Sequence, residues 1–144
     1  EREREGSRKV RLSEEEAVRI ESERMKRELE QKQTNPKYQE ILTKRRDLPA
    51  YQLKERVLDA LANKRTRVVV ISGDTGCGKT TQIPQMLLDE EIERGRGGRV
   101  NIVVTQPRRI SAISVAERIA QERIEPVGQT VGYHVRLEAK KSAR

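Results

Sequence analysis

Residues 68–80 read VVVISGDTGCGKT, an apolar run that leads directly into the phosphate-binding pattern G-x-x-x-x-G-K-[ST] at 73–80. Gly73, Gly76 and Gly78 let the backbone turn through angles that a side chain would forbid. Such a turn aims successive N–H groups, together with the N-terminus of the following helix, at phosphate oxygens. A strand before the pattern and a helix after it are the context of a phosphate loop, so the sequence predicts a nucleoside triphosphate site.

The predicted nucleotide site gives separate tasks to the residues of the loop. Lys79 should reach the β- and γ-phosphates, and the Thr80 hydroxyl should ligate Mg²⁺, which makes these two the candidate catalytic residues. The alternative is a glycine-rich turn that holds no ligand. The residues expected to line the nucleotide are Gly73, Asp74, Thr75, Gly76, Cys77, Gly78, Lys79, Thr80 and Thr81.

Charge is distributed unevenly along the 144 residues, of which 38% are charged, with a formal net charge of +8. Residues 1–35 hold ten Lys and Arg against ten Glu, whereas residues 36–144 hold 21 Lys and Arg against 13 Asp and Glu. The whole excess therefore lies with the phosphate loop, and it suggests a second polyanion such as nucleic acid. The alternative is that scattered basic residues only maintain solubility.

The single cysteine and the absence of long apolar runs bear on where the protein works. Cys77 has no partner for a disulfide within the chain, which fits a reducing compartment, and we interpret it as a small filler of the loop rather than a redox switch. No apolar run approaches the length of a membrane span or of a signal-peptide core. We expect a soluble intracellular protein of the nucleus, the cytoplasm or both, without a membrane partner.

Residues 1–35 form a charged helical leader or linker. Ser13 and Glu16 have the spacing of a capping box, and Val18, Met25 and Leu29 mark one weak apolar stripe behind it. Two alternatives stay open for this segment: a solvated linker helix, or a helix that docks on a partner or a neighbouring domain.

Residues 36–144 alternate between apolar runs and helical periodicity, which predicts an α/β fold with a parallel sheet. We expect buried parallel strands at 67–72, 100–105 and 130–137, and helices at 79–94 and 111–123. The sheet looks incomplete, because no Asp-containing strand follows within the chain, so we expect a piece of a larger protein or a domain that needs a neighbour. The apolar stripes expected to be buried comprise Leu53, Val57, Leu58 and Leu61, then Ile83, Met86 and Leu87, then Ile113, Ala116, Ile119 and Ala120.

A second candidate site is the segment 105–109, which reads TQPRR at the end of the second predicted strand. Ligands of open α/β sheets bind at that end. Arg108 and Arg109 beside a helix N-terminus, with Ser111 as the expected cap, would form a phosphate clamp. Exposed arginines on a solvated turn are the alternative.

These motifs together resemble the DEAH/RHA group of superfamily-two helicases. Residues 72–85 look like motif I of that family, 105–118 like motif Ia, 131–138 like the segment after it, and 46–49 like the lead-in to the first RecA-like domain. The resemblance covers about residues 35–144 and is nearest, at 110–114, to the branch of RNA helicase A and the G-quadruplex helicase. It implies that residues 36–144 are the N-terminal portion of a RecA-like ATP-binding domain.

The resemblance also implies roles for single residues. Arg109 and Arg136 would contact the RNA backbone, with Arg108 beside them, and Arg118 would stack on the nucleotide base. The implied ligands are ATP with Mg²⁺ and single-stranded RNA, including structured RNA such as a G-quadruplex, and the implied partner is the rest of the helicase core. Tyr133 and His134 are left as packing or surface residues.

The parent protein would then couple ATP hydrolysis to movement along RNA. The DEAH segment and the second RecA-like domain are missing from these residues, so the chain alone should bind nucleotide weakly and hydrolyse it negligibly. Two alternatives remain: a non-catalytic module that binds nucleotide or RNA, and another P-loop NTPase such as a nucleotide kinase or a transport ATPase. The segment 106–109 argues against the latter.

Overall fold

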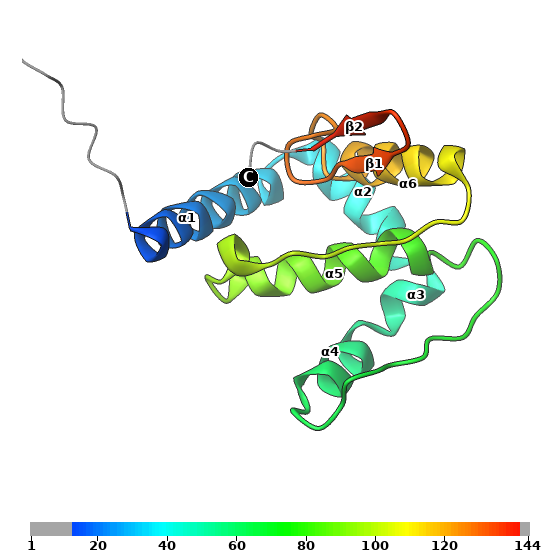
Figure 1. Ribbon diagram of the computed structural model, residues 1–144. Helices are drawn as coiled ribbons and strands as arrows, with labels where there is room; N and C mark the ends of the chain where they lie inside the picture. The colour runs from blue at the N-terminus through cyan, green and yellow to red at the C-terminus, as the bar shows by residue number, and fades with distance from the viewer. Residues whose placement is uncertain (1–12, 142–144) are drawn as a thin grey trace, which may run out of the picture.

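The computed structural model describes residues 13–141, which are mostly helical (Figure 1). The expected start of the leader, residues 1–12, lies outside this range. The elements in chain order are α1 (Glu14–Gln33), α2 (Pro36–Arg46), α3 (Pro49–Gln52), α4 (Lys54–Ala62), α5 (Lys79–Glu93), the 3₁₀ turn η1 (Gly97–Arg99), α6 (Arg109–Glu122), β1 (Tyr133–Val135) and β2 (Glu138–Lys140).

Helix α1 begins at the predicted capping box. The Ser13 hydroxyl accepts from the Glu16 backbone N–H at 3.2 Å, while the Glu16 carboxylate accepts from the Ser13 N–H at 3.1 Å. One face of the helix is buried and places Met25 and Leu29 against Ile92 of α5. The leader helix therefore docks on α5 and η1 of its own chain (Figure 1).

The glycine-rich turn after α5 allows this close approach. The Gly98 N–H donates to the Ser22 hydroxyl at 3.0 Å, and that hydroxyl donates to the Val18 carbonyl at 2.8 Å. A Cβ added to Gly98 would lie 2.5 Å from the same carbonyl oxygen, so any side chain there must push α1 away. Gly95, with a φ of +72°, ends α5 as the sequence predicts.

Helices α5 and α6 form where periodicity predicts them, but their buried faces differ from the expected stripes. Met86, Ala116, Ile119 and Ala120 are buried as predicted. Two of the three most enclosed side chains of α5, however, are polar, namely Gln82 at 0% and Gln85 at 2% exposure, beside Ile92 at 1%. The other expected stripe residues of these two helices, Ile83, Leu87 and Ile113, are half-buried, and in the α4 stripe only Val57 is buried.

Helix α6 begins two residues earlier than the predicted cap. Arg108 is extended, with φ −114° and ψ 134°, and occupies the N-cap position, so Ser111 lies inside the first turn. The prediction of Ser111 as the cap is therefore wrong. Arg108 makes no side-chain cap hydrogen bond, and the first two residues of the helix, Arg109 and Ile110, are exposed.

The predicted parallel sheet does not form among the residues described. Segments 67–72 and 100–105 are extended but unpaired, and Val68, Val70 and Val103 are 79%, 88% and 79% exposed. Within residues 13–141 the one ladder is antiparallel and pairs Tyr133 with Lys140 and Val135 with Glu138, so β1 lies in the third predicted strand, 130–137, and β2 lies beyond it. The physical reason is that a buried parallel strand needs neighbours on its edges and faces, and these two segments do not pair.

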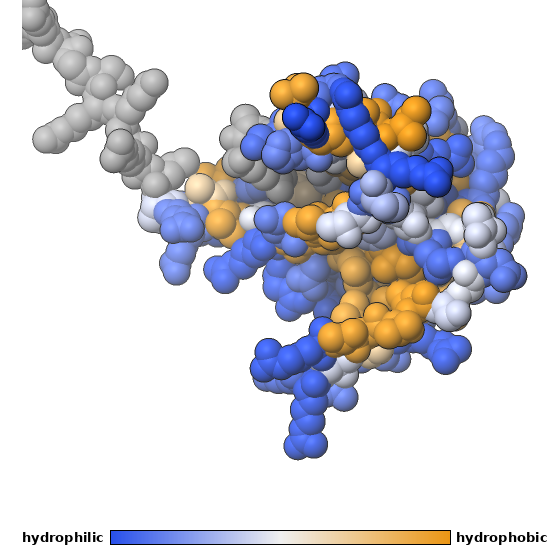
Figure 2. Space-filling model, turned by 45° about the vertical axis from the view of Figure 1, so that its right-hand side comes forward, coloured by the Kyte–Doolittle hydropathy of each residue, from blue (hydrophilic) through white to orange (hydrophobic). Residues whose placement is uncertain are grey.

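The unpaired segments leave apolar surface in contact with solvent. Figure 2 shows one large hydrophobic area in the lower part of the face it displays and smaller ones at the top and the left. Segment 100–104 crosses α5 and borders a hollow lined by apolar side chains of α5, α6 and β1. The exposed large hydrophobic residues are Ile20, Leu61, Val68, Val70, Ile102, Val103, Val104, Ile110 and Leu137.

We predict that Gly98→Ala lowers the free energy of unfolding by about 1–3 kcal/mol, because the added methyl group forces α1 away from the turn. Thermal or denaturant unfolding measures the change. Arg99→Ala, which alters the exposed neighbouring residue, is the control and should stay within about 0.5 kcal/mol of wild type. Equal stability of Gly98→Ala and wild type would contradict the docking of α1.

Candidate nucleotide and RNA interface

The predicted phosphate loop joins an extended segment to the N-terminus of α5. Gly76 and Gly78 have φ values of +83° and +92°, the left-handed conformations that the sequence predicts for them. Gly73 is different, because its φ is not in that region. A Cβ on Gly73 would lie 3.2 Å from the Cys77 sulfur and 3.7 Å from Lys79 Nζ, so glycine is needed there for space.

Two contacts attach the loop to the preceding helices. The Ala50 N–H of α3 donates to the Cys77 carbonyl at 3.0 Å, and a Cβ on Gly78 would lie 3.1 Å from the Leu48 side chain. Cys77 is half-buried against the loop, which fits the interpretation of this residue as a filler. The contacts leave Asp74, Thr75 and Gly76 exposed at the tip of the loop.

Lys79 folds back over the loop. Its ammonium group donates to the carbonyls of Gly73 and Asp74, the latter at 2.8 Å, and lies 3.3 Å from the Cys77 sulfur. Thr80 is exposed, one residue into α5. The loop therefore gathers Lys79 and Thr80 at the start of a helix, where a helix N-terminus favours anions. Their roles toward nucleotide and Mg²⁺ stay predictions.

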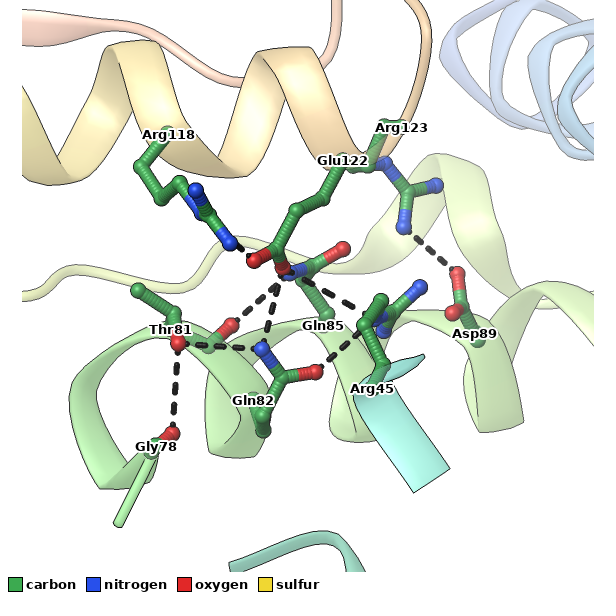
Figure 3. Close-up of polar contacts among 9 residues, drawn as sticks. All are labelled: Arg45, Gly78, Thr81, Gln82, Gln85, Asp89, Arg118, Glu122 and Arg123. Carbon is green, nitrogen blue, oxygen red and sulfur yellow. Dashed lines mark hydrogen bonds and ion pairs between the residues drawn. The ribbon is translucent and has the colours of Figure 1, made fainter. Parts of the chain in front are cut away.

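A buried polar cluster lies between α2, α5 and α6, and we call Arg45, Gln82, Gln85, Arg118 and Glu122 the Glu122 network (Figure 3). One carboxylate oxygen of Glu122 accepts from Gln82 Nε2 at 3.0 Å and from Gln85 Nε2 at 2.8 Å. The other oxygen accepts from Arg118 Nε at 2.8 Å. Arg45 Nε donates to the Gln82 oxygen at 2.8 Å and lies 3.7 Å from the carboxylate.

The Glu122 network keeps its carboxylate charged although the residue is only 5% exposed. Burial alone raises the pKa of Glu122, but hydrogen bonds from Gln82, Arg118 and Gln85 outweigh burial and hold that pKa below its ordinary value. Further along, an ion pair between Arg123 and Asp89 at 2.7 Å joins the C-terminal end of α6 to α5.

Sequence reasoning missed Arg45, Gln82, Gln85 and Glu122. Gln82, Gln85 and Met86 have the i, i+3, i+4 spacing of a buried helical face, so the stripe on α5 is present but partly polar. A count of apolar residues alone therefore predicts a different buried face of α5 from the one in the structure. One sequence signal could have indicated this network: glutamines occupy core positions on one predicted helix, and a glutamate follows Ile119 at i+3 on another.

The candidate RNA-binding arginines lie near the hairpin and the start of α6. Arg108 and Arg136 are exposed, the latter in the turn between β1 and β2. Arg109, with 60% of its side chain exposed, forms an ion pair with Glu138 of β2 at 3.0 Å. Hydrogen bonds from Tyr133 and from Arg109 hold the pKa of Glu138 below its ordinary value.

Tyr133 and His134, which the sequence left as packing or surface residues, differ in burial. Tyr133 is buried at 8% exposure, and its hydroxyl donates to Glu138. His134 is exposed. Arg109 is thus brought to the hairpin through Glu138, whereas Arg118 lies in the Glu122 network, so the structure separates the two groups of predicted arginines.

No family model matches the chain, but several curated proteins do. It is 50% identical to the DExH-box ATP-dependent RNA helicase DExH3 of Arabidopsis thaliana over 127 residues, which are 88% of this chain. It is 50% identical to the ATP-dependent DNA/RNA helicase DHX36 of Mus musculus over 115 residues, or 78% of the chain. It is 58% identical to the ATP-dependent RNA helicase DHX30 of Gallus gallus over 97 residues, or 67% of the chain.

The chain belongs to the DExH/DEAH-box RNA helicase family. The family resemblance carried by residues 72–85 and 105–118 is thereby confirmed. This DExH/DEAH-box chain spans only 10%, 11% and 8% of the lengths of the three relatives, so their full activity is not transferred to it directly. In the part of the helicase chain that the structure describes, no helix has the length and apolarity to cross a bilayer.

We predict that Glu122→Gln lowers the free energy of unfolding by about 1–3 kcal/mol at pH 7, because Arg45 and Arg118 lose their shared carboxylate. The pKa of Glu122 lies below its ordinary 4.5 in the folded state, so its contribution is present above that value and is lost as the pH falls through the folded pKa.

Denaturant unfolding of both proteins at a series of pH values from 7 downward measures this effect. The difference in stability between wild type and Glu122→Gln should shrink as the pH falls below 4.5 and through the folded pKa of the wild-type carboxylate. A difference that stays constant across the series would mean that shape rather than charge accounts for the role of Glu122.

Proposed function

We propose that the chain is the N-terminal portion of the RecA-like ATP-binding domain of an ATP-dependent RNA helicase. The single observation that carries this proposal is the phosphate loop at 73–80, with left-handed Gly76 and Gly78, at the start of a helix in a chain of this family. In the parent protein, segments 67–72 and 100–105 would become strands of a parallel sheet. Their exposed Val68, Val70 and Val103 support that assignment.

The residues of the loop fit a nucleoside triphosphate with Mg²⁺. The space that a Cβ on Gly73 would fill lies against Lys79, and the backbone on both sides of Gly76 can turn its N–H groups toward phosphates. Lys79 would leave the carbonyls of Gly73 and Asp74 for the phosphates, and Thr80 would hold Mg²⁺. The bound ion would neutralise charge that develops on the transferred phosphoryl group.

Nucleic acid would bind through Arg108, Arg109 and Arg136. All three are exposed, and the fixed ion pair with Glu138 orients Arg109 at the start of α6. Contacts of this kind reach the phosphate backbone and carry no base sequence information. Single-stranded RNA is the proposed ligand, and structured RNA such as a G-quadruplex is included. The DNA/RNA activity in the name of DHX36 is the reason to test DNA beside RNA.

The parent would couple ATP hydrolysis to movement along RNA, and the chain alone would bind ATP weakly with negligible turnover. Other parts of the helicase core supply the water-orienting group and the arginine finger, and the latter alone contributes about 10³–10⁵ in turnover. We thus propose that the chain supplies the nucleotide-binding part of the helicase core.

We predict that Lys79→Ala abolishes ATP turnover in the parent protein while RNA binding largely survives, because the loop loses its cation for the β- and γ-phosphates. Steady-state ATPase rates and RNA-binding titrations measure the two effects. Lys64→Ala, which removes an exposed lysine after α4, is the matched control and should retain turnover. Undiminished turnover of Lys79→Ala would exclude the proposed ATP site.

We predict that Arg109→Ala and Arg136→Ala each flatten the slope of log affinity against log salt concentration by roughly one, because each releases one fewer counterion. The measurement is an RNA-binding titration at several salt concentrations, repeated with single-stranded DNA of the same sequence. Arg99→Ala, at an exposed arginine in η1, should leave the slope unchanged. An unchanged slope in both variants would mean that these arginines are solvated surface charges that do not contact RNA phosphates.

A further inference from the structure

The Glu122 network joins a predicted base contact to the phosphate loop. We propose that Glu122 is a positioning residue, which holds the Arg118 guanidinium in the orientation that receives the base of a bound nucleotide. The inference rests on the proposed function, to which it adds the role that the family resemblance implies for Arg118, namely stacking on that base. It adds a residue that touches neither nucleotide nor RNA and acts through another side chain.

Arg118 needs such a partner because it is otherwise loosely held. Its side chain is 63% exposed, and within residues 13–141 its recorded hydrogen bond is the one from Nε to Glu122 at 2.8 Å. A free arginine loses rotamer entropy when a ligand fixes it. An arginine that is already fixed loses less on binding, so prior pairing with Glu122 favours the base contact.

The geometry of the pair leaves the stacking surface open. Hydrogen bonds to a guanidinium lie in its plane, so a carboxylate bound at Nε sets the direction of the plane without covering either face. The exposed fraction of Arg118 shows that solvent, and hence a flat ligand, can reach the group. Any nucleobase has such a face, so the contact would accept several bases.

Glu122 is itself held rigidly. Only 6% of its side chain is exposed, and its two oxygens accept from Gln82, Gln85 and Arg118 (Figure 3). Gln82 is fully buried and is fixed at its oxygen by Arg45. These donors hold the carboxylate in one position, and the hydrogen bond from Arg118 then holds the guanidinium in place.

The same hydrogen bonds continue to the end of the phosphate loop. Gln82 Nε2 donates to the Thr81 hydroxyl at 3.0 Å, and that hydroxyl donates to the Gly78 carbonyl at 3.3 Å. A path of polar contacts thus runs from Gly78 through Thr81, Gln82 and Glu122 to Arg118 (Figure 3). The phosphate contact on α5 and the base contact on α6 are therefore held at a fixed separation, which suits a ligand that carries both groups.

The experiment compares ATP with inorganic triphosphate, each with Mg²⁺, as ligands of the parent protein. The ratio of the two affinities isolates the contribution of the base and ribose from that of the phosphates. Arg118→Ala should lower the ratio about three- to tenfold, the range of a cation–π contact. Glu122→Gln should lower it by a similar factor and leave triphosphate affinity unchanged. The double variant should lose no more than either single one, because the two residues act as a unit.

Two further variants separate positioning from simple stabilisation. Glu122→Asp keeps the charge but shortens its reach to Arg118, and it should reduce the ratio even if Glu122→Gln does not fold. Asp89→Asn breaks the ion pair between α5 and Arg123 at the end of α6, and Asp89 does not pair with Arg118. This variant should lower stability while the ratio stays at the wild-type value.

The possible results distinguish the inference from the function on which it rests. A ratio unchanged by Arg118→Ala would refute base stacking itself, and the positioning role with it. A ratio lowered by Arg118→Ala but unchanged in the folded Glu122 variants would overturn the inference alone. Equal weakening of ATP and triphosphate in the Glu122 variants, or an equal loss of ratio in Asp89→Asn, would also overturn it.

Discussion

A buried negative charge between helices is the constraint on which the arrangement of this chain depends. An ionised carboxylate cannot stay inside a protein without donors, and Glu122 finds them on α5 and α6. Arg45 of α2 adds an ion pair at 3.7 Å. Paired buried charges contribute little net stability against an apolar alternative, whereas loss of one partner is costly. The Glu122 network therefore fixes the relative positions of three helices more than it strengthens them.

The position of α5 in turn fixes the features at its two ends, the phosphate loop and the contact with α1. Its N-terminus carries the phosphate loop, and its C-terminal turn receives α1 through the close contact at Gly98. Helix α6 starts at the predicted RNA contacts and ends at Glu122. One rigid pair of helices thus holds the groups proposed to contact phosphate, base and RNA, which is an arrangement suited to linking nucleotide state with RNA binding.

Local sequence signals predicted the helices and the loop well, because their causes are local. The Ser13 capping box, the left-handed Gly76 and Gly78, and the end of α5 at Gly95 depend on residues within a few positions. The sheet could not be obtained in this way, since pairing of 67–72 with a neighbour depends on strands elsewhere. The Glu122 network was missed because the two glutamines that donate to Glu122 are 37 and 40 residues away in sequence and are polar, so apolar periodicity does not detect them.

Hydrogen–deuterium exchange of the parent protein, with and without Mg·ATP, tests most directly whether α5 and α6 respond to nucleotide as one unit. The account predicts that ATP protects amides of residues 73–81 and of the α6 segment around Arg118 and Glu122 together, and that inorganic triphosphate protects the loop more than α6. Protection of the loop by ATP with no change in α6 would contradict the account.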